Sequence, residues 1–212
     1  MRLPLVLSFS LLVVACGGKT LESGVDDDDG TDASSDGAIT DTGVPADWTS
    51  CSGAGQCALI ARTCCGSCAT PTVSDMVAVH TGYESKYRDK VCGPTPPACP
   101  DCAPYIADDS LQAWCVAGRC TAIDVRKESV SSCTTDSDCM LRHSGCCESC
   151  EGRRDDLVAL SKASIGDYRA KVCVGDEACP RCMPDYPTDA MARCDIATKH
   201  CVVDWVALPG GG

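Results

Sequence analysis

The chain has 212 residues, of which 21 are cysteine, and its formal net charge is −12. Nucleic acids and anionic lipid surfaces both require a cationic face, so the acidic composition excludes them as partners. Aromatic residues make up only 4% of the chain. Small domains with so little large apolar surface commonly depend on disulfide bonds rather than on an extended core.

Residues 1–15 predict a secretory signal peptide. Arg2 is followed by an apolar run from Leu3 to Val14, which is far shorter than the roughly 20 residues that span a bilayer as a helix. The run ends in Val13-Val14-Ala15-Cys16, which resembles the lipobox of bacterial lipoproteins.

That resemblance implies that Cys16 is lipidated and becomes the mature N-terminus, which anchors the protein to a membrane. Gly17 stands where the family's inner-membrane retention signal has Asp, so the resemblance implies the outer membrane, with the protein facing the periplasm or the cell surface. The alternative is a soluble protein whose Cys16 is removed with the leader.

Residues 16–50 are interpreted as the lipidated cysteine and a disordered acidic tether. Between residues 17 and 50 there are nine acidic residues and one lysine, and such a segment cannot bury enough apolar surface to offset its ordering entropy. The run from Asp26 to Asp32 fits a calcium loop poorly, because Val25 and Ala33 fall at ligand positions. A solvated spacer is the preferred interpretation.

The other twenty cysteines form two sets of ten in nearly the same order, which indicates a duplicated module. We predict module 1 at residues 51–125, a linker at 126–132, module 2 at 133–206 and a flexible tail at 207–212. Ten cysteines per module favour complete pairing in an oxidising compartment. The predicted structural disulfide residues are Cys51, Cys57, Cys64, Cys65, Cys68, Cys92, Cys99, Cys102, Cys115, Cys120, Cys133, Cys139, Cys146, Cys147, Cys150, Cys173, Cys179, Cys182, Cys194 and Cys201.

The order of the cysteines leaves the pairing within a module open. Because the first strand should lie beside the last hairpin, we expect Cys51 and Cys57 to pair with Cys115 and Cys120. The central cysteines at 64, 65 and 68 would then pair with those at 92, 99 and 102. Twelve arrangements remain open.

In module 1 the elements follow in the order strand, helix, hairpin. Cys57 to Ala61 reads as a short strand, and apolar residues at three- and four-residue spacing from Met76 to Val91 predict an amphipathic helix. Ala113 to Val125 reads as a hairpin that turns near Gly118. The predicted fold class is therefore α+β.

Module 2 repeats this order. Cys139 to Leu141 reads as a strand, Leu157 to Val172 as a helix, and Ala192 to Val206 as a hairpin that turns near Thr198 and Lys199. The whole chain is thus predicted to be two small disulfide-rich modules after a disordered acidic tether.

A second resemblance concerns the cysteine pattern of module 2. The segment Cys133-Thr134-Thr135-Asp136-Ser137-Asp138-Cys139 with Cys146-Cys147-Glu148-Ser149-Cys150 is similar to an uncharacterised module of secreted bacterial proteins. The resemblance implies architecture but no activity. Module 1 departs from it, with Ser52-Gly53-Ala54-Gly55-Gln56 where the acidic residues would be.

Three chemistries were weighed against purely structural cysteines. The motifs Cys99-Pro100-Asp101-Cys102 and Cys179-Pro180-Arg181-Cys182 could serve an envelope thiol–disulfide oxidoreductase. Cys64, Cys65 and Cys68 with a distant CxxC have ligand-like spacing for zinc, but export to an oxidising compartment disfavours thiolates. The loop from Cys92 to Cys99 faintly resembles the Pro-Pro reactive loop of Bowman–Birk protease inhibitors.

The remaining polar motifs favour packing over chemistry. His80, His143 and His200 do not recur at matching positions, and Tyr87 and Tyr168 are expected to pack on their modules. We therefore predict no catalytic residue, no cofactor and no metal. The preferred hypothesis is a non-catalytic binding, adhesive or envelope-structural lipoprotein with an unknown protein or glycan ligand; the alternatives are the oxidoreductase and a surface-displayed protease inhibitor.

Overall fold

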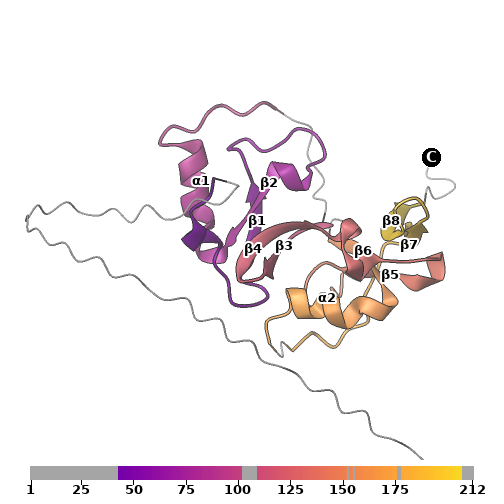
Figure 1. The fold of residues 1–212 in the computed structure, drawn as a ribbon. Helices are drawn as coiled ribbons and strands as arrows, with labels where there is room; N and C mark the ends of the chain where they lie inside the picture. Colours follow the sequence, from indigo (N-terminus) through magenta and orange to yellow (C-terminus); the bar gives the residue numbers. More distant parts are fainter. Residues whose placement is uncertain (1–42, 102–108, 152, 155, 176–177, 207–212) are drawn as a thin grey trace, which may run out of the picture. The chain divides into compact units, whose positions relative to one another are not determined.

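The computed structural model describes residues 43–101, 109–151, 153–154, 156–175 and 178–206 (Figure 1). The predicted signal peptide, Cys16, most of the tether and the tail at 207–212 lie outside the described residues. Within the described part, no helix has the length and hydrophobicity that a bilayer crossing requires.

Each module contains two antiparallel hairpins and one short helix. The elements of module 1 are β1 (Cys57–Ala61), β2 (Met76–His80), α1 (Glu84–Cys92), β3 (Leu111–Val116) and β4 (Arg119–Asp124). Those of module 2 are β5 (Cys139–His143), β6 (Leu157–Ser161), α2 (Ile165–Val172), β7 (Ala190–Asp195) and β8 (His200–Trp205). Strands pair as β1–β2, β3–β4, β5–β6 and β7–β8, which confirms the α+β class.

Each predicted helix is wrong in its first part and correct in its second part. Met76 to His80 and Leu157 to Ser161 are strands, and each helix begins only at Glu84 or Ile165. Every residue of β6 is buried, so this stretch is a continuous apolar run and not one face of a helix. A short apolar run of this kind cannot be assigned by periodicity alone.

Both predicted terminal hairpins are confirmed, and their turns have a clear backbone cause. Ala117 and Gly118 have positive φ angles of 49° and 79°, the conformation that a tight turn between twisted strands demands. The turn of the second hairpin ends at Lys199, whose φ is 62°.

Nine disulfide bonds join described cysteines, and they keep the flanking and central sets separate as predicted. The pairs of module 1 are Cys51–Cys115, Cys57–Cys120, Cys64–Cys92 and Cys65–Cys99. The pairs of module 2 are Cys133–Cys194, Cys139–Cys201, Cys146–Cys173, Cys147–Cys179 and Cys150–Cys182. Cys68 is also disulfide-bonded, and the duplication predicts Cys102, outside the described residues, as its partner.

The modules begin earlier than the cysteine pattern predicts. Residues 44–49, assigned to the tether, include the fully buried Val44 and a 3₁₀ turn, Ala46–Thr49. Residues 125–131, mostly assigned to the linker, form two such turns, Val125–Lys127 and Ser129–Ser131. Both segments therefore belong to the folded modules, because their apolar residues are needed to cover the second strand of each module.

The two segments are equivalent in detail. Thr49 Oγ donates to the Ala46 carbonyl at 3.0 Å, and Ser131 Oγ donates to the Glu128 carbonyl at 2.9 Å. Each segment ends in an isolated antiparallel bridge to the last hairpin, Ser50 to Arg119 or Ser132 to His200. We therefore count residues 44–50 with module 1 and residues 125–132 with module 2.

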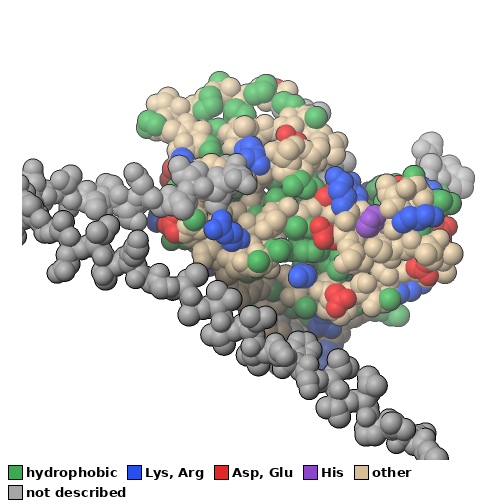
Figure 2. Space-filling view, viewed as in Figure 1, with side chains coloured by type: hydrophobic (Ala, Val, Ile, Leu, Met, Phe, Trp, Pro, Cys, Tyr) green, Lys and Arg blue, Asp and Glu red, His purple; other side chains and the backbone are tan. Residues whose placement is uncertain are grey.

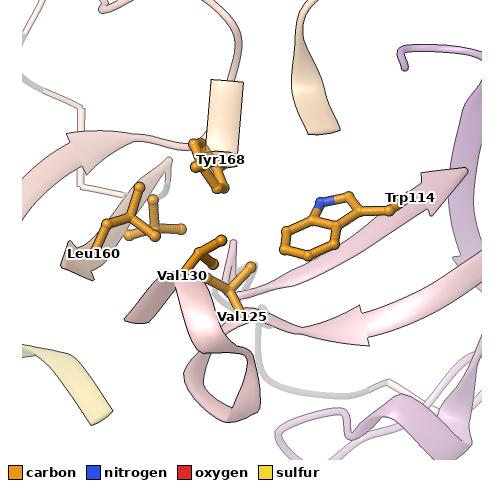
Figure 3. Packing of buried hydrophobic residues seen from close by; sticks show 6 residues of the cluster. Trp114, Val125, Val130, Leu160 and Tyr168 are labelled. Carbon is orange, nitrogen blue, oxygen red and sulfur yellow. The ribbon is translucent and has the colours of Figure 1, made fainter. Parts of the chain in front are cut away.

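The largest apolar cluster joins the modules. Trp114 of β3 packs with Val158, Leu160 and Tyr168 of module 2, together with Val125 and Val130. Figure 3 shows the indole of Trp114 directed toward Tyr168, with the valines between them and Leu160. A smaller cluster of Val44, Val77, Val79 and Tyr87 lies within module 1. The two modules thus share a core, and module 2 is completed by a side chain from module 1.

Candidate functional site: a groove repeated in both modules

The clearest candidate site is a groove between β6 and β8 in module 2, with a volume of about 390 Å³. Its size falls in the range of small-ligand and peptide sites. Its walls come from both hairpins, from the 3₁₀ turn at 125–127 and from neighbouring loops. The lining residues are Thr70, Asp109, Ser110, Val125, Arg126, Arg154, Leu157, Val158, Ala159, Cys201, Val202, Val203 and Trp205.

Module 1 contains the equivalent groove between β2 and β4, with a volume of about 300 Å³. Its lining residues are Thr49, Arg62, Val73, Met76, Val77, Ala78, Arg119, Cys120, Thr121 and Ala122. The cysteine alignment places Met76 to Ala78 opposite Leu157 to Ala159, and Cys120 to Ala122 opposite Cys201 to Val203. The groove is therefore a property of the repeated fold, present at the same place in each copy.

The groove of module 2 has an aromatic and cationic end. Trp205 is 40% exposed, and the Arg154 guanidinium lies 4.3 Å from the centre of its ring. Arg154 is also ion-paired with Asp189 at 2.6 Å. This contact fixes the orientation of the indole at the mouth of the groove and leaves part of its surface open to a ligand.

The other arginine of this groove is paired as well. Arg126 contacts Asp124 through two hydrogen bonds, Nε to Oδ1 at 2.8 Å and an NH₂ group to Oδ2 at 3.1 Å. Burial would raise the pKa of Asp124, but the hydrogen bonds and the positive charge of Arg126 outweigh it, so the pKa is lowered. Both cations are thus held by carboxylates. Figure 2 shows acidic and basic side chains interspersed on the visible face, so this face does not carry a strong field of one sign.

The described cysteines of the predicted redox and zinc motifs are disulfide-bonded, and Cys102 lies outside the described residues. In the second CxxC motif, Cys179 bonds to Cys147 and Cys182 bonds to Cys150, so the motif does not close on itself. Sulfur atoms of Cys133, Cys139 and Cys201 lie within 4.8 Å of one another, but these cysteines are disulfide-bonded and are not the thiolates that bind metals.

The acidic motif of module 2 has a structural role. The Asp138 carboxylate accepts hydrogen bonds from the backbone N–H groups of Thr134 and Thr135, both at 2.9 Å. Asp136 accepts from the backbone of Cys194 at 2.9 Å. In module 1, Gln56 replaces Asp138 and its side-chain oxygen accepts from the Ser52 backbone at 2.7 Å. Module 1 therefore closes the same loop with a neutral side chain in place of the carboxylate.

The histidines have three different local roles. The His80 side chain accepts from the Gly82 backbone at 3.1 Å, and His200 Nδ1 lies 2.8 Å from Ser131 Oγ. His143 is 2% exposed, with Nδ1 3.1 Å from Asp156 and its ring stacked on Tyr186. None of the three lines a groove, so they do not identify the site.

The predicted packing role of the repeated tyrosines is confirmed. Tyr87 is 4% exposed and Tyr168 is fully buried. The Tyr87 hydroxyl donates to the Arg62 carbonyl at 3.0 Å, and the Tyr168 hydroxyl donates to the equivalent Ser144 carbonyl at 2.5 Å. These tyrosines therefore fix the chain that leaves β1 or β5.

No protein-family model, curated protein or solved structure matches the chain. The site must therefore be judged from its geometry. Sequence reasoning missed the groove residues, of which Arg154 and Trp205 differ most from their module 1 counterparts, Val73 and Asp124. These positions could have been found in the sequence by comparing the two modules and selecting equivalent positions whose residues differ in chemistry.

Proposed function

We propose that the protein is a lipid-anchored outer-membrane protein with a non-catalytic role, in which the tandem modules bind an extracytoplasmic partner through the paired grooves. Cys-rich modules closed by disulfide bonds fit a non-catalytic extracellular role. The lipobox-like leader supports anchoring through Cys16. The acidic segment after it supports a spacer between the membrane and the modules.

The observation that carries the binding role is the recurrence of the groove at equivalent residues. Substitutions after the duplication were free to fill the groove in either copy, yet both copies keep it although their lining residues have diverged. Two sites on one chain also raise the effective concentration for a partner with two matching segments.

Site-specific photo-crosslinking in the producing cells tests this function. A benzoylphenylalanine at Val203 or Ala122, in the two grooves, should give a discrete crosslinked species. The same probe at Ile196, which is 74% exposed on the turn of the last hairpin, is the control. Equal crosslinking from all three positions, or none from the grooves, would contradict a groove-based binding role.

Membrane anchoring needs a separate test. Cys16→Ser should move the protein from the membrane fraction to the soluble fraction and abolish incorporation of labelled palmitate. Retention of the variant in the membrane fraction would contradict the lipid anchor without affecting the groove.

A further inference from the structure

The groove of module 2 is bordered by the unpaired edges of two strands. In the β5–β6 ladder the Ser144 N–H bonds to the Asp156 carbonyl, and the register pairs Arg142 with Val158. The even-numbered residues of β6 therefore bond to β5, and the N–H and C=O groups of Leu157 and Ala159 point away from it. Both residues line the groove.

The same reasoning applies to β8. The Val206 N–H bonds to the Asp189 carbonyl, and the register pairs Arg193 with Val202. The backbone groups of Val203 and Trp205 therefore point away from β7. Among the described residues, neither Val203 nor Trp205 has a backbone partner on this side.

The edge of β8 is open because its neighbouring chain segment turns away. Ser132 forms an antiparallel bridge with His200, and the Cys133 N–H bonds to the Lys199 carbonyl at 2.9 Å. A strand continuing from this bridge would pair next with Val203 and Trp205. Instead, residues 129–131 and 125–127 form 3₁₀ turns, so the ladder stops after its first pair.

Module 1 protects its equivalent groove and module 2 does not. The Arg62 guanidinium donates to the Ser74 carbonyl at 2.7 Å and to the Met76 carbonyl at 3.2 Å, which satisfies outward-facing groups at the β2 edge. Ser144 occupies the matching position in module 2, and its short side chain cannot reach in the same way. A capped edge resists the addition of another strand, whereas an open edge is a template for it.

We propose that the groove of module 2 binds an extended peptide segment of a partner protein by strand addition to the free edge of β8. This assignment rests on the proposed binding function and names its ligand class. Alternating backbone N–H and C=O groups along an edge are complemented by another extended backbone. Val203 would supply the central backbone contacts, and Trp205 would contact a side chain at one end of the peptide.

The test begins with selection of octapeptides from a random phage-displayed library on the full oxidised chain. The selected peptide is then titrated against the wild type and Val203→Pro. Proline removes an N–H that has no partner in the fold, and an edge position tolerates it. We expect Val203→Pro to weaken peptide binding by roughly tenfold or more, as loss of edge hydrogen bonds requires.

The control is Ile196→Pro, on the exposed turn of the same hairpin and outside both grooves, which should leave binding unchanged. A second pair exchanges the edge cap: Ser144→Arg should weaken binding, and Arg62→Ser should leave the module 2 site intact. Circular dichroism and disulfide mapping establish that each variant is folded. If Val203→Pro does not fold, alternate N-methylation of the peptide tests the same contacts without changing the protein.

Two peptides N-methylated at odd or at even positions should differ, because only one set faces β8. Equal affinity of both for the protein, or failure to select any octapeptide, would overturn strand addition. If a benzoylphenylalanine at Trp205, which also lines this groove, still captures a partner in Val203→Pro, the proposed function stands while this inference fails. Loss of groove crosslinking altogether would remove both.

Discussion

Replacing Tyr168 by Phe tests how strongly the two modules depend on each other. The Tyr168 hydroxyl donates to the Ser144 carbonyl at 2.5 Å and accepts from Gln112 Nε2 at 2.8 Å. Gln112 belongs to module 1, and its side-chain oxygen accepts from the indole N–H of Trp114 at 2.8 Å. The hydroxyl therefore links the backbone of module 2 to the side chains of module 1.

The module 1 counterpart provides a matched control. The Tyr87 hydroxyl has one such bond, to the Arg62 carbonyl. A buried group that loses its partner costs about 1–3 kcal/mol, and an ordinary hydrogen bond contributes about 1 kcal/mol net. We expect Tyr168→Phe to lower the free energy of unfolding by about 2–3 kcal/mol and Tyr87→Phe by about 1 kcal/mol.

Urea unfolding at pH 7 with all disulfides intact measures both losses. If Tyr168→Phe costs no more than Tyr87→Phe, the hydroxyl does not couple the modules and the reasoning is refuted.

The difference in the free energy of unfolding between the wild type and Tyr168→Phe should shrink at high pH. Burial raises the pKa of Tyr168 from 10.0 to about 12, so the folded protein favours the neutral phenol. That stabilisation is complete below pH 10 and is lost as the pH rises from 10 toward 12. Tyr168→Phe lacks this contribution, so its free energy of unfolding should approach that of the wild type between pH 10 and pH 12. A constant gap would contradict the buried-phenol explanation.

Three further measurements probe the fold. The hydrogen bonds from Thr134, first its hydroxyl and then its backbone, lower the pKa of Asp138 from 3.8 to about 2. The stabilising effect of the Asp138 carboxylate is therefore present above pH 3.8 and is lost as the pH falls through 2. In NMR, the amide signal of Thr134 should titrate near pH 2, whereas the amide signal of Ser52 should not. Removing Cys139–Cys201 by double Ala substitution opens a loop of about 13 residues beside Cys133–Cys194, and calorimetry should show a loss of about 3 kcal/mol. Leu160→Ala, at a fully buried site, should cost about 2–5 kcal/mol in urea unfolding, whereas Ile196→Ala should cost under about 0.5 kcal/mol.

The disulfide framework was predictable because it depends on the order of elements. Once a first strand is placed beside a last hairpin, the pair Cys51 and Cys57 must lie near the pair Cys115 and Cys120, and the central cysteines have only one another as partners. The individual bonds could be assigned only from the structure. Adjacent cysteines such as Cys64 and Cys65 lie at almost the same place in the chain, and only the directions of their side chains decide which partner each one reaches.

The ends of the modules and the groove were not predictable for different reasons. Val44 and Trp48 are isolated apolar residues in a polar segment, so composition assigned them to the tether. The groove depends on which residues of β6 and β8 bond to their partners, and a shift of one residue would turn the free backbone groups to the other side. No local pattern fixes that register before the strands and their disulfides are placed.

The differences between the two copies suggest how their roles have separated. Arg62 closes the β2 edge in module 1, and Ser144 leaves the β6 side open in module 2, although the tyrosine behind each position makes the same contact. Because the shared core places Trp114 of module 1 in module 2, the closed copy also supports the fold of the open one. In the proposed binding role, the capped groove of module 1 is therefore expected to be the weaker of the two sites and the open groove of module 2 the stronger. If so, crosslinking from Val203 should exceed crosslinking from Ala122, and Arg62→Ser should raise the latter.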